Sequence, residues 1–312
     1  MEHTNMKDKP KEKLENPDGF LIIPLGAIGA LFGLAVVLLS PGETPQSVAF
    51  RQNPEFVVWL FTIVVQATLF AILPLFLFKA LIKLKQYASK HIVKIVLSSL
   101  GFLFLADLPS TFLGLGRLVS FSFPLAYHEL RFRILTITGL LTTALPASIG
   151  IWLVYSALTV SFKETHINKE SAGHYLFLHR QLHIFLFILG LIVSVATLAT
   201  GASRRALIAA GIPAEAFPLE LVLVYGGYYT FLIALLYIPV YLSLIEFGRR
   251  LVDRFYPLSA LELESEEWEN TYEKRGKLEE LLRLRVTAQQ GLETGVAIFA
   301  PLLSGFISFL VK

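Results

Sequence analysis

The sequence contains no cysteine among its 312 residues. The chain therefore cannot form disulfides, bind a metal or an iron–sulfur cluster through thiolates, or use a cysteine nucleophile. It is also poor in charge, because Asp, Glu, Lys and Arg make up only 16% of it. A soluble domain carries about 25% charged residues, so this composition excludes a soluble enzyme of ordinary surface.

Apolar residues, in contrast, are abundant. They make up 54% of the chain, including 25 phenylalanines, and the mean hydropathy is +0.63. This excludes a disordered protein and predicts an all-α, polytopic helical protein of the lipid bilayer. The net charge of +3 is too weak and too scattered for nucleic-acid binding, and the lysines beside apolar runs are expected to set topology and contact lipid headgroups.

Six apolar runs are long enough to cross a membrane, which takes about 20 residues. The predicted spans are Phe20–Leu39, Phe56–Phe78, Ile95–Leu118, Ile134–Phe162, Leu182–Thr200 and Pro218–Phe247. The first run is longer than the apolar region of a cleaved signal peptide, so we expect it to be retained. A further run, Val296–Val311, is shorter and is interrupted by Pro301, which makes it marginal for a span.

Basic residues predict the orientation of these spans. Fifteen of them lie in the tail and in alternate connections, and six lie in the opposite connections. The positive-inside rule then places the N-terminus and residues 249–290 in the cytoplasm, with the protein in the plasma (inner) membrane. The predicted organisation is a disordered tail (1–18), a six-helix membrane domain (19–248), a cytoplasmic amphipathic helical segment (249–290) and an apolar C-terminal segment (291–312).

Asp107 is the one charged residue near the middle of a predicted span. A carboxylate in hydrocarbon costs about 2.5–3.5 kcal/mol and usually faces the bundle interior or water. Pro109 follows it and is expected to break the helix, while Ser110 and Thr111 offer hydroxyls to the freed carbonyls. The pattern predicts a cation or proton site. The alternative is a structural aspartate bonded to hydroxyls or to a tyrosine on a neighbouring helix.

Other polar residues inside the predicted spans are Gln66, Tyr225 and Tyr229. The two tyrosines share a helix face, so we expect them to line an ion-binding site or pore opposite Asp107. The alternative is ordinary helix packing, for which Gly226 would allow a close approach.

His179 and His183 are four residues apart at the expected start of the fifth span, and they are weak candidates for a metal site. An interfacial anchor or a pH-sensitive cytoplasmic mouth is the alternative. The sequence contains none of the intramembrane-protease, desaturase or dinucleotide-binding motifs, so we expect neither catalytic residues nor a cofactor.

The segment after the sixth span is polar. Ser259 and Glu262 match a capping box, and a helix is expected from there to about Gln290. Its apolar stripe predicts an oligomer or partner interface, formed by Trp268, Tyr272, Leu278 and Leu282. The stripe could also pack on the chain's own membrane domain. The apolar segment that follows is expected to be re-entrant or interfacial, buried against the bundle or between subunits.

Three functional hypotheses follow from these features. The first is a homo-oligomeric ion channel or pore, based on the six spans and the sparse buried charge. The second is a secondary transporter coupled to protons or cations through Asp107. The third is a non-transporting membrane component that docks a cytoplasmic protein through its C-terminal helix.

Overall fold

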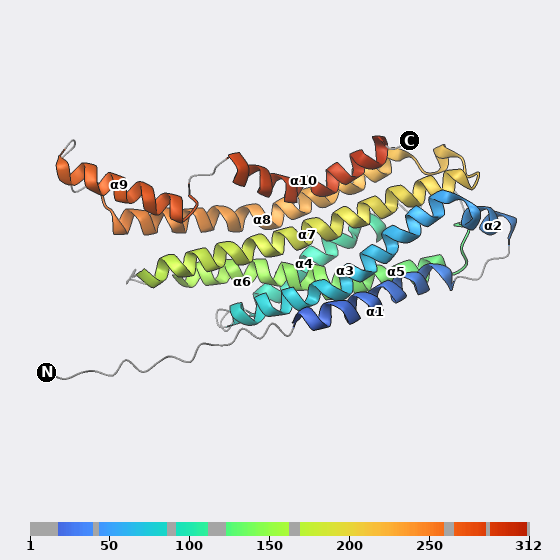
Figure 1. The fold of residues 1–312 in the computed structure, drawn as a ribbon, viewed down its shortest axis with the longest axis horizontal. Coiled ribbons are helices and arrows are strands. Elements are labelled where there is room, and N and C mark those ends of the chain that lie inside the picture. The colour runs from blue at the N-terminus through green and yellow to red at the C-terminus, as the bar shows by residue number, and fades with distance from the viewer. Residues whose placement is uncertain are drawn as a thin grey trace.

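The computed structural model of the chain describes residues 18–39, 44–85, 92–111, 123–161, 169–258, 265–284 and 288–310. Throughout these ranges the regular structure is helical and contains no strand, which confirms the predicted all-α class. Figure 1 shows the long helices lying side by side along the longest axis of the molecule. The predicted disordered tail falls almost entirely outside the described residues.

The described residues form ten α-helices and two short turns of other helical type. In chain order they are α1 (Asp18–Leu38), α2 (Pro45–Gln52), α3 (Pro54–Leu84), α4 (Ile92–Thr111), α5 (His128–Gly139), the π-helical turn η2 (Leu140–Ala144), α6 (Leu145–Ser161), α7 (Lys169–Ala209), the 3-10 turn η3 (Ala214–Ala216), α8 (Leu219–Phe255), α9 (Glu266–Leu281) and α10 (Ala288–Leu310).

Among the described residues, five helical segments are long and apolar enough to cross a membrane. They are Gly19–Leu38, Pro54–Leu84, His128–Val160, Glu170–Ala209 and Ala214–Phe255. Large apolar side chains on their outer surfaces are exposed, among them Phe61, Phe187 and Phe231. A water-facing surface rarely carries so much apolar area, so the fold is compatible with a helical membrane protein. The third predicted span, Ile95–Leu118, corresponds to α4, which is not among these five segments, so its crossing of the membrane stays a prediction.

The observed helices extend well beyond two of the predicted spans. The fifth was expected to begin at Leu182, but α7 begins at Lys169 and contains 41 residues. The sixth was expected to end at Phe247, but α8 continues to Phe255, across the predicted domain boundary at residue 248. A helix of 41 residues is about 60 Å long, twice the hydrocarbon thickness. Hydropathy marks only the part of each helix that is suited to hydrocarbon, whereas the helix itself continues beyond that part.

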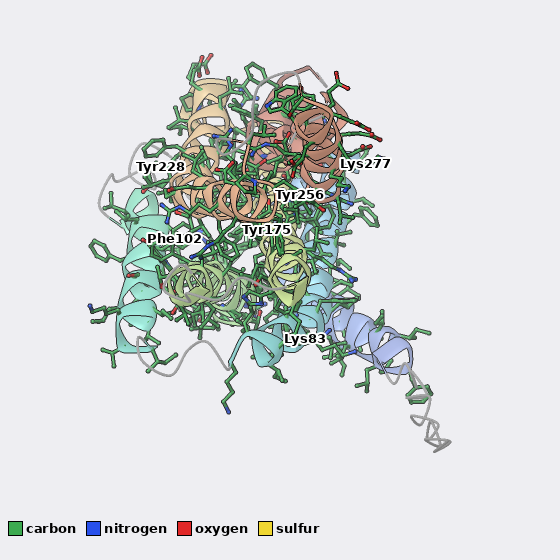
Figure 2. The ribbon with its side chains drawn as sticks, turned by 90° about the vertical axis from the view of Figure 1, so that its left-hand side faces the viewer. Lys83, Phe102, Tyr175, Tyr228, Tyr256 and Lys277 are labelled. Atoms are coloured by element: carbon green, nitrogen blue, oxygen red, sulfur yellow. The ribbon has the colours of Figure 1, made fainter. Side chains whose placement is uncertain are left out.

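Helix α4 differs from its neighbours in direction. Figure 2 looks along the long axis of the bundle and shows α4 from the side, while α6 and α7 are seen nearly end-on. It packs across α6 and α8. The helix is continuous through Pro109 to Thr111, so the break expected at the proline is wrong. The remainder of the third predicted span, residues 112–118, lies outside the described residues.

Small residues bring α1 against α3. A Cβ atom added at Gly29 would lie 2.7 Å from the Ala67 carbonyl oxygen, and one added at Gly33 would lie 2.8 Å from the Cα of Val64. Apolar burial gives little driving force between helices in lipid, so close backbone approach and dispersion contacts hold such pairs together. The four-residue spacing of the two glycines therefore fixes where α1 docks.

Helix α10 packs against both α7 and α8, and Figure 1 shows it running alongside α8. Gly190 of α7 faces the Ala297 carbonyl, and a Cβ atom at Gly226 of α8 would lie 2.7 Å from the Pro301 carbonyl oxygen. The C-terminal apolar segment thus packs on its own bundle. Its re-entrant or interfacial placement in a membrane stays a prediction.

Candidate functional site

A cavity of about 100 Å³ lies between α3, α4, α5, η2, α7 and α8. Its polar lining consists of Gln66 from α3, Thr136 from α5, and Tyr225 and Tyr229 from α8, and the rest is apolar. The space corresponds to about three water molecules. Three residues predicted to line an ion-binding site or pore, Gln66 of α3 and Tyr225 and Tyr229 of α8, therefore line one cavity.

The tyrosines of α8 connect the cavity to α4. The hydroxyl of Tyr229 donates to the Ala106 carbonyl at 2.7 Å, and its side chain is also hydrogen-bonded to Tyr225. The neighbouring hydroxyl of Tyr228 donates to the Leu105 carbonyl at 2.6 Å. In an unbroken helix that carbonyl would accept from the amide of residue 109, which is a proline and has no N–H.

Tyr228 therefore satisfies the carbonyl that Pro109 leaves free. From the sequence we expected the hydroxyls of Ser110 and Thr111 to bond to this carbonyl. Their backbones belong to α4, but their side chains lie outside the described residues. A partner more than a hundred positions away could not be read from local spacing. Figure 2 shows the labelled Tyr228 beside α4.

Asp107 occupies a different place from the one expected. Ala106 is buried and lines the cavity, but the next residue turns by about 100° around the helix, and the side chain of Asp107 is exposed on the protomer surface. Of the two expected environments, the bundle interior or water, the single chain does not place it in the bundle interior, and a water-facing position stays a prediction. It still lies close enough to interact electrostatically with Tyr225 and Tyr229.

The π-helical turn η2 forms one wall of the cavity through Leu140 and Ala144, next to Gly139 at the end of α5. Pro146 follows it and removes the N–H that the Thr142 carbonyl would accept in an α-helix. The backbone hydrogen bonds shift by one residue at this point. The amide of Leu145 donates to the Leu140 carbonyl, five residues earlier instead of four. Such turns are frequent at functional sites.

The sequence analysis did not predict the π-helical turn that forms this wall of the cavity. Pro146 preceded by Thr142 and Thr143 could have indicated it, because hydroxyls that bond back to helix carbonyls often accompany a proline in a membrane helix. In the structure Thr143 donates to the Gly139 carbonyl. The ring of Phe70 packs directly on Gly139, where no side chain would fit.

The two histidines lie within α7, not at a helix start. Their rings are 4.5 Å apart, and the ring of His183 is 6.3 Å from that of Tyr237 on α8. His179 is buried, which does not fit an exposed interfacial anchor. Among the described residues no group of three His, Cys, Asp or Glu side chains could hold a metal ion. The metal hypothesis for this pair therefore finds no third ligand in that part of the chain.

The stripe expected on the C-terminal helix divides into two parts. Trp268 and Tyr272 stack with ring centroids 5.1 Å apart, and Tyr272 is 51% exposed. Leu278 and Leu282 pack on the chain's own core instead. The helix described begins after Ser265, whose hydroxyl caps the Trp268 amide, and the capping box expected at Ser259 lies outside the described residues.

Comparison with known proteins gives no match. No family model matches the chain, and no curated protein or solved structure matches it either. The geometry of the cavity and of its surroundings is therefore the basis for a functional proposal.

Proposed function

We propose that the protein is a membrane transporter that moves a proton or a small cation through the interior of the protomer, with Gln66, Tyr225 and Tyr229 forming the binding site and Asp107 supplying its negative charge. The observation that supports this is the cavity itself, where polar groups from separate helices converge beside a carboxylate. In an apolar bundle such groups are costly and usually functional.

The chemistry of the lining suits a small cation. The amide oxygen of Gln66 and the tyrosine hydroxyl oxygens replace part of a hydration shell, and the volume leaves room for only a few waters. The Tyr225–Tyr229 hydrogen bond suits a proton equally well, because it continues to the Ala106 carbonyl beside Asp107. A larger solute would not fit this conformation. The irregular backbone at η2 is the natural place for a helix to bend as the site opens.

Reconstitution tests this proposal. Purified protein in liposomes is given a proton, sodium or potassium gradient, and the flux is followed with a pH- or cation-sensitive dye. We expect a saturable flux that falls at least tenfold in Asp107→Asn, because the neutral amide cannot balance the charge of the cation. Asp253→Asn, which changes an exposed carboxylate near the end of α8, is the matched control and should leave the flux unchanged. No flux under any gradient, or full flux in Asp107→Asn, would contradict the proposal.

A homo-oligomeric channel is a second candidate, supported by the exposure of Asp107. A carboxylate facing lipid costs about 2.5–3.5 kcal/mol, and a second copy of the chain packed on α4 would remove it from lipid. Planar-bilayer recordings separate the two candidates. Discrete single-channel openings that depend on Asp107, together with a stable oligomer in light scattering, would favour the channel. Slow flux without openings, from a monomer, would favour the transporter.

A further inference from the structure

A second hollow lies outside the candidate site, between the C-terminal half of α3 and the N-terminal half of α7. Its volume is about 860 Å³, within the range of ligand-binding clefts. Most of its lining is apolar and includes Leu73, Phe76, Ile184 and Phe187. We call this hollow the α3–α7 groove. Its size and lining suit hydrocarbon chains, not a polar solute.

Basic side chains gather on this groove. Lys79 and Lys83 from α3 and Arg180 from α7 all line it, and each is exposed. Among the described residues that line the groove, none is acidic. The groove therefore presents positive charge beside an apolar floor, which is the complement of an anionic amphiphile.

Gln181 adds a specific polar contact. It lines the groove and is only 5% exposed, and its Oε1 atom is buried with no hydrogen-bond partner in the part of the chain that the structure describes. A buried acceptor left unpaired is destabilising, and a bound water, ion or ligand often supplies the partner of such an atom. The missing partner must be a donor, which the phosphate of a phosphodiester cannot provide.

We propose that the α3–α7 groove binds an anionic phospholipid whose headgroup carries hydroxyls. The acyl chains lie on the apolar floor, the phosphodiester contacts Lys79, Lys83 and Arg180, and a headgroup hydroxyl donates to Gln181 Oε1. The positive-inside prediction puts this end of α3 and α7 at the cytoplasmic leaflet, where anionic headgroups attract basic residues. The proposal is independent of ion transport.

Native mass spectrometry of the full chain in detergent tests this proposal with three lipids of equal chain length. Phosphatidylglycerol has the charge and the hydroxyls, phosphatidylmethanol has the charge alone, and phosphatidylcholine has no net charge. We expect one retained phosphatidylglycerol, bound about fivefold more tightly than phosphatidylmethanol and at least 25-fold more tightly than phosphatidylcholine. One hydrogen bond accounts for a factor of about five in affinity, and two cationic contacts account for a factor of about 25.

Variants assign the contacts. Lys79→Gln/Lys83→Gln should weaken phosphatidylglycerol binding about 25-fold, whereas Lys94→Gln/Arg249→Gln, which removes two exposed charges outside the groove, should not. Gln181→Leu should abolish the preference for phosphatidylglycerol over phosphatidylmethanol and leave the charge preference intact. The melting temperature of each variant shows whether it is folded. If a variant is not folded, competition among the three lipids for the unaltered chain tests the proposal instead.

Three results would overturn the proposal. Equal binding of phosphatidylcholine would show that charge does not select the ligand. Equal losses in both double variants would show a general surface effect. Displacement of the bound lipid by inorganic phosphate at millimolar concentration would identify a phosphate site instead of a lipid site.

Discussion

At the scale of single residues, the contact between Tyr228 and Leu105 explains how a proline is tolerated in α4. Pro109 removes one donor from the helix, and a hydroxyl from α8 replaces it at 2.6 Å. A carbonyl left without a donor in a packed helix costs free energy, and the hydroxyl of Tyr228 supplies that donor. The same contact, with that of Tyr229 one residue on, ties α4 to the wall of the cavity.

This interpretation predicts a coupling between two substitutions. Tyr228→Phe should destabilise the protein by about 1 kcal/mol, the usual size of a hydrogen bond between membrane helices. In a Pro109→Ala background the restored amide satisfies Leu105, so the same substitution should cost close to nothing. Unfolding in mixed micelles measures both, with Tyr272→Phe on exposed α9 as the control. A cost that is equal in the two backgrounds would contradict this account of the bond.

At the scale of elements, glycine positions decide how helices approach. Gly33 of α1 faces the backbone of Val64, whereas Gly173 of α7 has nothing within 4 Å of where a Cβ would lie. We therefore predict that Gly33→Ala destabilises the protein by about 1–3 kcal/mol through overpacking, while Gly173→Ala is neutral or slightly stabilising. Thermal unfolding in detergent compares the two. Similar shifts in melting temperature for both would count against the observed docking of α1.

The packing of α10 against α7 gives a second prediction at the scale of elements. Gly190→Ala places a methyl group against the Ala297 carbonyl, so α10 should separate from α7. Hydrogen exchange should then rise at least tenfold in α10 while α6 is unaffected. Gly101→Ala, on α4 with open space around it, is the matched control and should leave exchange in α10 unchanged. Unaltered protection of α10 in Gly190→Ala would show that this contact does not hold it.

The sequence predicts the helical class and five of the six membrane-crossing helices, because each depends on composition within one segment. It fails where a feature depends on two segments. The pairing of Tyr228 with Leu105 and the division of the α9 stripe both require tertiary contacts. The length of α7 was missed for another reason, since its ends are polar and hydropathy marks only the part suited to lipid.

At the scale of the whole molecule, α9 and the N-terminal end of α1 lie toward the same end of the bundle, and α2 and η3 lie at the opposite end (Figure 1). This is the arrangement that an even number of crossings produces. The positive-inside rule predicts that the end that carries α9 is the cytoplasmic one. The sixth crossing and this orientation both stay predictions.

Because the chain has no cysteine, single cysteines report this topology directly. An impermeant maleimide added to intact cells should label Gln46→Cys before α3 and Glu215→Cys before α8, both exposed. Asn270→Cys on α9 should be labelled only after the membrane is permeabilised. The reverse pattern would invert the orientation, and labelling of all three sites in intact cells would exclude a shared cytoplasmic end.

The central claim is that ions pass through the cavity inside the protomer, and blocking that cavity tests it most directly. Ala196 of α7 lines the cavity, whereas Phe231 of α8 is exposed on the outer surface. Each is replaced by cysteine, reconstituted, and modified with methyl methanethiosulfonate, which adds one small group whose attachment is verified by mass. The account predicts at least a tenfold loss of gradient-driven flux on modification of Ala196→Cys and no change for Phe231→Cys. Undiminished flux through fully modified Ala196→Cys would contradict it.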